Sequence, residues 1–136
     1  MQNENGVKVI ENLPSLSEKK AEGISLIQDY WTPEANGETK RVFIVGIKDE
    51  IYVRDDGQEV ELPCVIMLEP DEKGSAKSFK NGSKRLVAAI HRLIKEGTIK
   101  TIAFDDPTGV EITYLGKQRN ATNQYSHDSW DLKRLV

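Results

Sequence analysis

The stretch that decides the fold is VEITYLGKQRNATNQYSHDSWDLKRLV, residues 110–136. In its first part Val110, Ile112 and Tyr114 occupy every second position, which is the period of a strand with one buried face. A second strand follows near the C-terminal end, with Trp130 and Leu132 on one face and polar residues on the other. The stretch therefore predicts a β-hairpin, and the residues upstream are expected to form the rest of a small barrel around it.

The loop between these two strands, residues 117–124, has an unusual composition for a hairpin tip. It contains Lys117 and Arg119, three amide side chains after them, and no acid, and Tyr125 follows directly. Loops do not enter the core, so packing does not require this composition. We interpret the loop as a ligand-contacting element, although an ordinary solvated hairpin tip would explain the same residues.

Three apolar stretches upstream have the length of strands and are separated by turn signals. They cover residues 24–31, 40–47 and 60–68. Gly46 interrupts the second stretch, which predicts a bulge or a sharp bend. Residues 98–109 contain only a short apolar piece before the hairpin.

One helix is expected, in the stretch KRLVAAIHRLIKEG after Ser83. Its apolar residues recur at helical spacing and form one stripe: Leu86, Val87, Ala89, Ile90, Leu93 and Ile94. Ser83 is a suitable N-cap, and Gly97 is placed to end the helix. A helix of this length is marginal in water by itself. We therefore expect the stripe to pack against the sheet.

The chain of 136 residues suits one domain with one core. Residues 1–22 are polar and are expected to form a flexible N-terminal arm, which leaves residues 23–136 as the domain. The N-terminus lacks the features of a secretion signal, and no apolar run is long enough to cross a bilayer. With the single Cys64 in an apolar run, the sequence predicts a cytoplasmic protein with a buried thiol.

The small net charge of −3 conceals a strong segregation of charge. Residues 49–72 carry nine acids and one base, whereas residues 73–95 carry seven bases and no acid. Segregated charge can steer a ligand toward the basic surface. The alternative is that the two segments neutralise each other across the fold.

No residue constellation indicates catalysis. The two histidines, His91 and His127, lie in the expected helix and hairpin, and the glycines do not form a phosphate-binding loop. One cysteine and two histidines do not make a zinc site. We therefore expect no enzymatic activity, no cofactor and no metal.

The expected order is three strands, one helix and two strands. This order resembles an OB-fold, a five-stranded Greek-key barrel with the helix between strands 3 and 4. The resemblance implies an all-β fold with one main helix. A curved sheet with one packed helix and a different topology remains an alternative.

The C-terminal ITYLGKQRNATNQYSHDSWDLKRL also resembles the closing hairpin of small single-stranded DNA-binding proteins from phages and mobile elements. In that family an apolar strand that ends near Gly-Lys leads into a polar, basic loop and a short strand with an aromatic residue. The resemblance covers residues 23–136. One departure is the C-terminus, because bacterial single-stranded DNA-binding proteins end in an acidic tail and this chain ends in WDLKRLV.

The resemblance implies binding of single-stranded DNA, or of RNA, in replication, recombination or transfer of a phage or mobile element. Single strands are held by bases that attract phosphates and by aromatic rings that stack on nucleobases. The residues expected to bind are Trp31, Lys40, Arg41, Lys48, Lys117, Arg119 and Tyr125. The alternative function is a protein–protein adaptor without catalysis, with the acidic segment or the basic helix as its contact surface.

Overall fold

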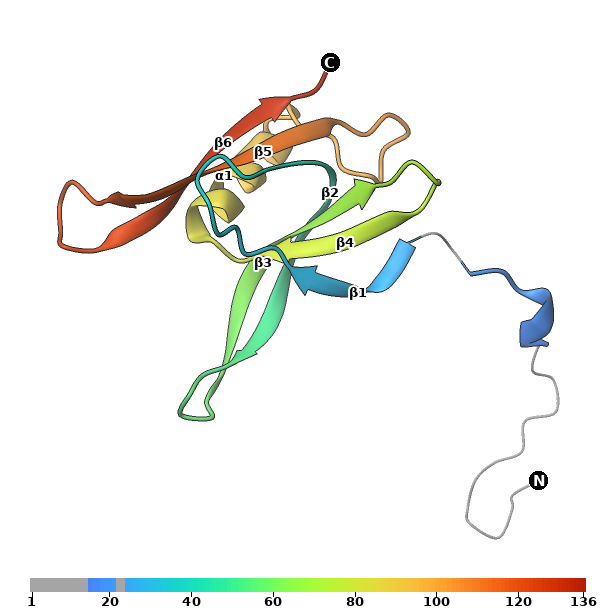
Figure 1. Cartoon of the computed structure of the whole chain (residues 1–136), viewed down its shortest axis with the longest axis horizontal. Coiled ribbons are helices and arrows are strands. Elements are labelled where there is room, and N and C mark those ends of the chain that lie inside the picture. The colour runs from blue at the N-terminus through green and yellow to red at the C-terminus, as the bar shows by residue number, and fades with distance from the viewer. Residues whose placement is uncertain (1–14, 22–23) are drawn as a thin grey trace, which may run out of the picture.

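The computed structural model describes residues 15–21 and 24–136 (Figure 1). Most of the expected N-terminal arm, residues 1–14 and 22, lies outside the described residues. The part that is described contains one turn of 3₁₀ helix, η1 (Leu16–Glu18).

Six strands form a single open sheet, and one α-helix packs against it (Figure 1). The strands are β1 (Ile24–Tyr30), β2 (Thr39–Val53), β3 (Glu59–Pro70), β4 (Ala76–Asn81), β5 (Gly109–Arg119) and β6 (Ser126–Arg134), and the helix is α1 (Lys84–Lys95). Their order in the sheet is β1-β4-β3-β2-β5-β6, with β1 parallel to β4 and every other pair antiparallel. The expectation of a β-rich fold with one main helix is confirmed.

The expected closed barrel of five strands is not observed, because the sheet has six strands and no pairing among the described residues joins its two ends, β1 and β6. The strand outside the stretches expected to form strands is β4, whose sequence AKSFKN lies in the basic segment and has one large apolar residue, Phe79. β4 pairs with β3 across the turn at residues 71–75 and also accepts β1 on its other side. The helix therefore follows the fourth strand of the chain and not the third.

The bend expected at Gly46 is confirmed as a register shift between Ile44 and Gly46. Before the bend, residues 39–43 of β2 pair with β5; beyond it, β2 pairs only with β3 among the described residues. The far ends of β2 and β3 therefore leave the body of the sheet as a projecting hairpin, residues 47–63 (Figure 1). We call this hairpin the β2–β3 arm.

The core lies between α1 and the middle of the sheet. Leu86 and Ile90 of α1 are fully buried among residues of three strands: Val42, Ile44, Val65, Met67, Val110 and Ile112. Ser83 stands at the N-cap position, and the amide of Gly97 donates to the carbonyl of Ile94 just after the helix ends. The apolar stripe therefore faces the sheet as expected. Within the described residues, no helix has the length and apolar character needed to span a membrane.

We expect Ile90→Ala to lower the free energy of unfolding by about 2–5 kcal/mol, because it leaves a cavity that rigid neighbours cannot fill. Denaturant unfolding measures this loss. The matched control is Leu16→Ala, which truncates an apolar side chain that is 84% exposed and should change stability little. Equal effects of the two substitutions would mean that α1 does not pack as described.

Candidate nucleic-acid interface

A bulge in β5 places Lys117 on the same face of the hairpin as Tyr114. The register shifts between Tyr114 and Gly116, so that Tyr114 lies opposite Trp130 and Lys117 lies opposite Asp128. Gly116 has a φ of 91°, and the side chain of Asn36 occupies the space that a Cβ would need. Only glycine fits this position without displacement of its neighbours.

Three aromatic rings meet at the root of this hairpin. The ring centroids of Trp31 and Trp130 are 5.6 Å apart at 64°, and those of Tyr114 and Trp130 are 5.1 Å apart at 57°. These are edge-to-face and tilted arrangements, which aromatic pairs favour. The indole N–H of Trp130 donates to the hydroxyl of Ser83 at 3.0 Å, so the cluster is attached to the start of α1.

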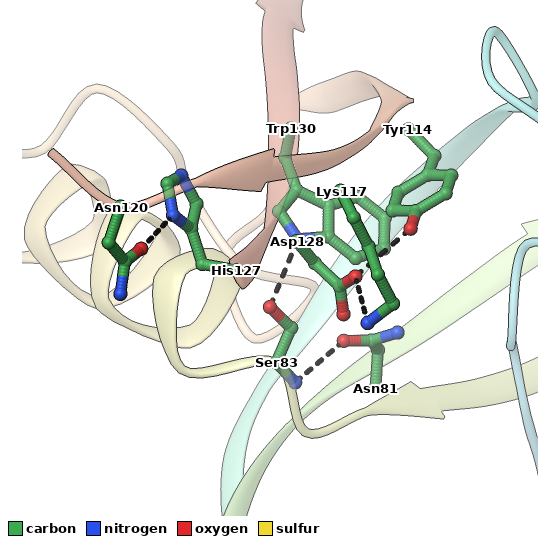
Figure 2. A network of polar contacts seen from close by, with 8 residues as sticks. All are labelled: Asn81, Ser83, Tyr114, Lys117, Asn120, His127, Asp128 and Trp130. Carbon is green, nitrogen blue, oxygen red and sulfur yellow. Dashed lines mark hydrogen bonds and ion pairs between the residues drawn. The ribbon is translucent and has the colours of Figure 1, made fainter. Parts of the chain in front are cut away.

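Asp128 connects the aromatic cluster to Lys117 (Figure 2). Its Oδ1 accepts a hydrogen bond from the Tyr114 hydroxyl at 3.0 Å and one from Lys117 Nζ at 3.3 Å. Burial raises the pKa of Tyr114 above its ordinary value, and the hydrogen bond to Asp128 and the charge of Asp128 raise it further. Tyr114 is therefore a neutral donor that holds Asp128 in place.

Asn81 fixes the backbone on the other side of the cluster. Its side-chain N–H₂ donates to the carbonyl of Trp31 at 2.9 Å, and its carbonyl oxygen accepts from the amide of Ser83 at 2.8 Å. Asn81 is buried, and both ends of its amide are used. The end of β1, the end of β4 and the start of α1 are thereby held together beside the hairpin.

Two adjoining depressions open on this surface. The aromatic pocket, of about 260 Å³, is lined by Tyr30, Trp31, Tyr114 and Trp130, together with Ser83, Lys117 and Asp128. The basic pocket, of about 240 Å³, is lined by Lys84, Arg85, Lys117 and His127, together with Ser83 and Asp128. Because both pockets include Ser83, Lys117 and Asp128, one continuous surface combines aromatic rings with bases.

The tip of the β5–β6 hairpin is ordered by its own amide side chains. The side-chain Oδ1 of Asn123 accepts a hydrogen bond from the side-chain N–H₂ of Asn120 at 3.0 Å and one from the backbone amide of Tyr125 at 2.8 Å. The side chain of Asn120 also bonds the imidazole of His127 (Figure 2). These contacts give the amides a structural role, and they leave the ring of Tyr125 66% exposed at the tip.

Three of the seven expected binding residues lie together on this hairpin: Lys117, Arg119 and Tyr125, all of them exposed. Trp31 is only 5% exposed, and its indole N–H donates to Glu38 at 2.7 Å. The expectation that Trp31 is a free stacking platform is therefore corrected, because its ring belongs to the core and only lines the aromatic pocket.

The remaining expected residues lie elsewhere. Lys40 pairs with Glu69 at 3.3 Å, and its Nζ lies 4.2 Å from the ring centroid of Phe79, so its charge is used inside the fold. Arg41 pairs with Glu111 at 3.0 Å.

Adjacent strand residues point to opposite faces, so Arg41 lies on the side of the sheet away from Lys40. Lys48 lies at the root of the β2–β3 arm, where it pairs in register with Cys64. These residues do not form one surface with the β5–β6 hairpin.

Sequence reasoning did not place Lys84 and Arg85 in the site. The signal was the run of seven bases in residues 73–95, but the sequence alone does not show which of these bases approach the hairpin. Trp130 brings them there, since its bond to Ser83 fixes the first turn of α1 beside β6.

Burial raises the pKa of the Cys64 thiol, with Glu50 and Asp49 adding to the shift, so Cys64 is a poor nucleophile at neutral pH.

Comparison with known proteins found no matching family model, no matching curated protein and no matching solved structure. Among the residues that the structure describes, no group of three or more His, Cys, Asp or Glu side chains is arranged to hold a metal ion.

We expect Asp128→Asn to lower the pKa of Tyr114 while leaving it above its ordinary value, because burial is the larger cause of the shift. The measurement is the phenolate absorbance as pH rises, with Tyr114→Phe used to assign the signal. A raised pKa also means that this tyrosine stabilises the fold below its unfolded pKa of about 10 and ceases to do so as pH rises through the folded value. Asp131→Asn on the same strand is the control, and an unchanged Tyr114 titration in Asp128→Asn would contradict the network.

Proposed function

We propose that this protein binds single-stranded nucleic acid along the surface formed by the aromatic pocket, the basic pocket and the β5–β6 hairpin. The observation that carries the proposal is that the two pockets adjoin at Ser83, Lys117 and Asp128, so the aromatic rings of one pocket lie beside Lys84 and Arg85 of the other. Every nucleotide has a charge and a flat base, and single-strand binders combine a basic groove with aromatic platforms for this reason.

The charges around the basic pocket favour a phosphate there. Within the described residues Lys84 and Arg85 form no ion pair, whereas Lys117 is matched by Asp128. The first turn of α1 adds backbone N–H groups and the positive end of the helix dipole. A base would then lie over the exposed ring of Tyr30 or the partly exposed ring of Trp130, and the strand would continue toward Arg119 and Tyr125.

The topology supports an OB-fold relationship within this proposal. β2, β3 and β4 follow one another through hairpins, and β5 returns by the long connection through α1 to lie beside β2. The resulting order β5-β2-β3-β4 is that of a Greek key. With β6 beside β5, these five strands have the order of an OB-fold opened between β4 and β6, and β1 is an addition.

In an OB-fold the loop between the last two barrel strands contributes to oligonucleotide binding. Here that loop is the tip of the β5–β6 hairpin, which contains the exposed Tyr125. The resemblance of the C-terminal hairpin to phage and mobile-element proteins leads us to propose a role in replication, recombination or transfer of such an element in the cytoplasm. Either DNA or RNA satisfies the chemistry of the site.

We expect the double substitution Lys117→Ala with Arg119→Ala to weaken binding of a fluorescent oligo-dT and to reduce its dependence on salt. Each lost phosphate contact should lower the magnitude of the slope of log affinity against log salt by about 0.7. Fluorescence anisotropy at several salt concentrations measures both quantities. The melting temperature should change little, because the one ion pair lost is exposed and such pairs contribute about 0–1 kcal/mol.

The matched control for this experiment is Lys73→Ala with Lys77→Ala. It removes the same charge from exposed positions in the β3–β4 turn and at the start of β4, far from the β5–β6 tip (Figure 1). An equal loss of affinity in both double variants would show only a general charge effect. Parental affinity in the Lys117/Arg119 variant would contradict the proposed site.

We expect Tyr125→Ala to weaken oligo-dT binding by about 1–3 kcal/mol if its exposed ring stacks on a base. Tyr125→Phe keeps the ring face and should retain most of the affinity. Anisotropy titrations at constant salt distinguish the two variants. Equal affinity of Tyr125→Ala and the parent would limit the interface to the pockets.

A further inference from the structure

The β2–β3 arm has an open sheet edge along residues 47–53 of β2. β5 pairs with β2 only over residues 39–43. The next residue, Ile44, is bonded by the connection between α1 and β5, because the amide of Ile102 donates to the Ile44 carbonyl at 3.0 Å. Beyond that point the described residues place β3 on one side of β2 and no strand on the other (Figure 1). An uncovered edge of this length can pair with another extended chain.

Apolar side chains surround this edge although nothing in the described fold covers them. Ile51 is 65% exposed, Tyr52 49% and Val53 56%. Ile102 and Phe104 are also exposed, and the connection that contains them contacts β2 at Ile44, just before this edge begins. Apolar groups gathered beside an open edge are typical of a binding surface, whereas single exposed residues are not.

The charge of the arm identifies the kind of occupant. Residues 47–63 contain six acids (Asp49, Glu50, Asp55, Asp56, Glu59 and Glu61) and two bases, Lys48 and Arg54. In the described residues only one of these acids forms an ion pair, Glu50 with Lys80 at 3.7 Å. A second copy of the arm would bring like charges together, which disfavours strand pairing.

The opposite edge of the arm is less suited to accept a strand. It belongs to β3 and contains Pro63, which has no backbone N–H to donate. Residues 47–53 of β2 contain no proline. The edge of β2 is therefore the side on which a continuous ladder can form.

We propose that the β2 edge at residues 47–53 binds an extended, basic segment of another protein by strand addition. Main-chain hydrogen bonds to β2 supply affinity, and the occupant's lysines or arginines lie on the face of Ile51 and Val53, where their aliphatic stems cover these side chains and their charged ends extend toward Glu59 and Glu61. The alternate residues of the occupant are apolar and lie on the other face, beside Tyr52. In the register of the arm, Ile51 lies opposite Glu61 and Val53 opposite Glu59, so both rows lie on one face. This surface is separate from the proposed nucleic-acid interface.

In the test, a synthetic peptide in which lysine and valine alternate is titrated into the isotope-labelled full chain. Heteronuclear NMR monitors the amide shifts of the protein during the titration. We expect the largest shift changes at the amides of residues 47–53 and at Ile102. A peptide with every valine replaced by proline keeps the charge but cannot form a ladder, and it should leave these amides unchanged. Equal shifts with both peptides, or none with either, would overturn the proposal.

The substitution pair Ile51→Thr with Val53→Thr should weaken peptide binding by roughly tenfold, because it removes exposed methyl groups that the occupant would bury. Threonine keeps the β-branch and preserves the strand. Leu115→Thr, also an exposed apolar position, is the control and should bind as the parent does.

Two further outcomes are decisive. Concentration-dependent self-association that shifts the same amides without peptide would overturn the proposal in favour of a second copy as occupant. Peptide binding that survives Lys117→Ala with Arg119→Ala would support a surface independent of the nucleic-acid site, and its loss in that variant would overturn the proposal.

Discussion

Burial of one face of α1 against the middle of the sheet is the interaction on which the remaining structure depends. Leu86 and Ile90 pack against residues of β2, β3 and β5, and thereby join β5 to two strands that are distant from it in the sequence. A helix of this length is marginal in water, so the sheet also stabilises the helix. Because α1 follows β4 directly, its first turn is held at the end of the sheet, next to the last hairpin.

The candidate site is a consequence of this placement and of three hydrogen bonds around Ser83 and Asn81. Trp130 donates to Ser83, and Asn81 joins Ser83 to the end of β1, so three segments meet where the bases of α1 begin. The bulge at Gly116 then turns Lys117 toward them. Backbone geometry thus produces a surface with both rings and charges, and most of its polar groups already have partners within the fold.

The sequence predicted the features that depend on local residue patterns. It did not predict features that depend on which distant segments pair with or contact a residue. The stripe of α1, the bend at Gly46 and the final hairpin follow from residue spacing, and the structure contains each of them. β4 was missed because AKSFKN has almost no apolar pattern; it becomes a strand because β3 and β1 pair with its two edges. The exposure of Trp31 was wrongly predicted for a related reason. Its ring is buried in part by Trp130, which is distant in the sequence and contacts it only in the folded protein. Adjacent Lys40 and Arg41 look like one basic patch in the sequence, yet strand alternation separates them.

The segregated charge of the chain has a spatial counterpart in the two projecting hairpins. The β5–β6 tip and the start of α1 are basic, whereas the β2–β3 arm is acidic. Among the described residues, Lys80–Glu50 is the only ion pair that joins the basic segment, residues 73–95, to the acidic segment, residues 49–72. Mutual neutralisation across the fold therefore accounts for only a small part of the charge. An acidic arm repels a polyanion, so the proposed nucleic-acid strand is expected to lie on the side of Lys84, Arg85 and Lys117. The same separation makes the two proposals compatible, because a basic protein segment on the arm and a nucleic-acid strand on the basic surface would use different parts of the molecule.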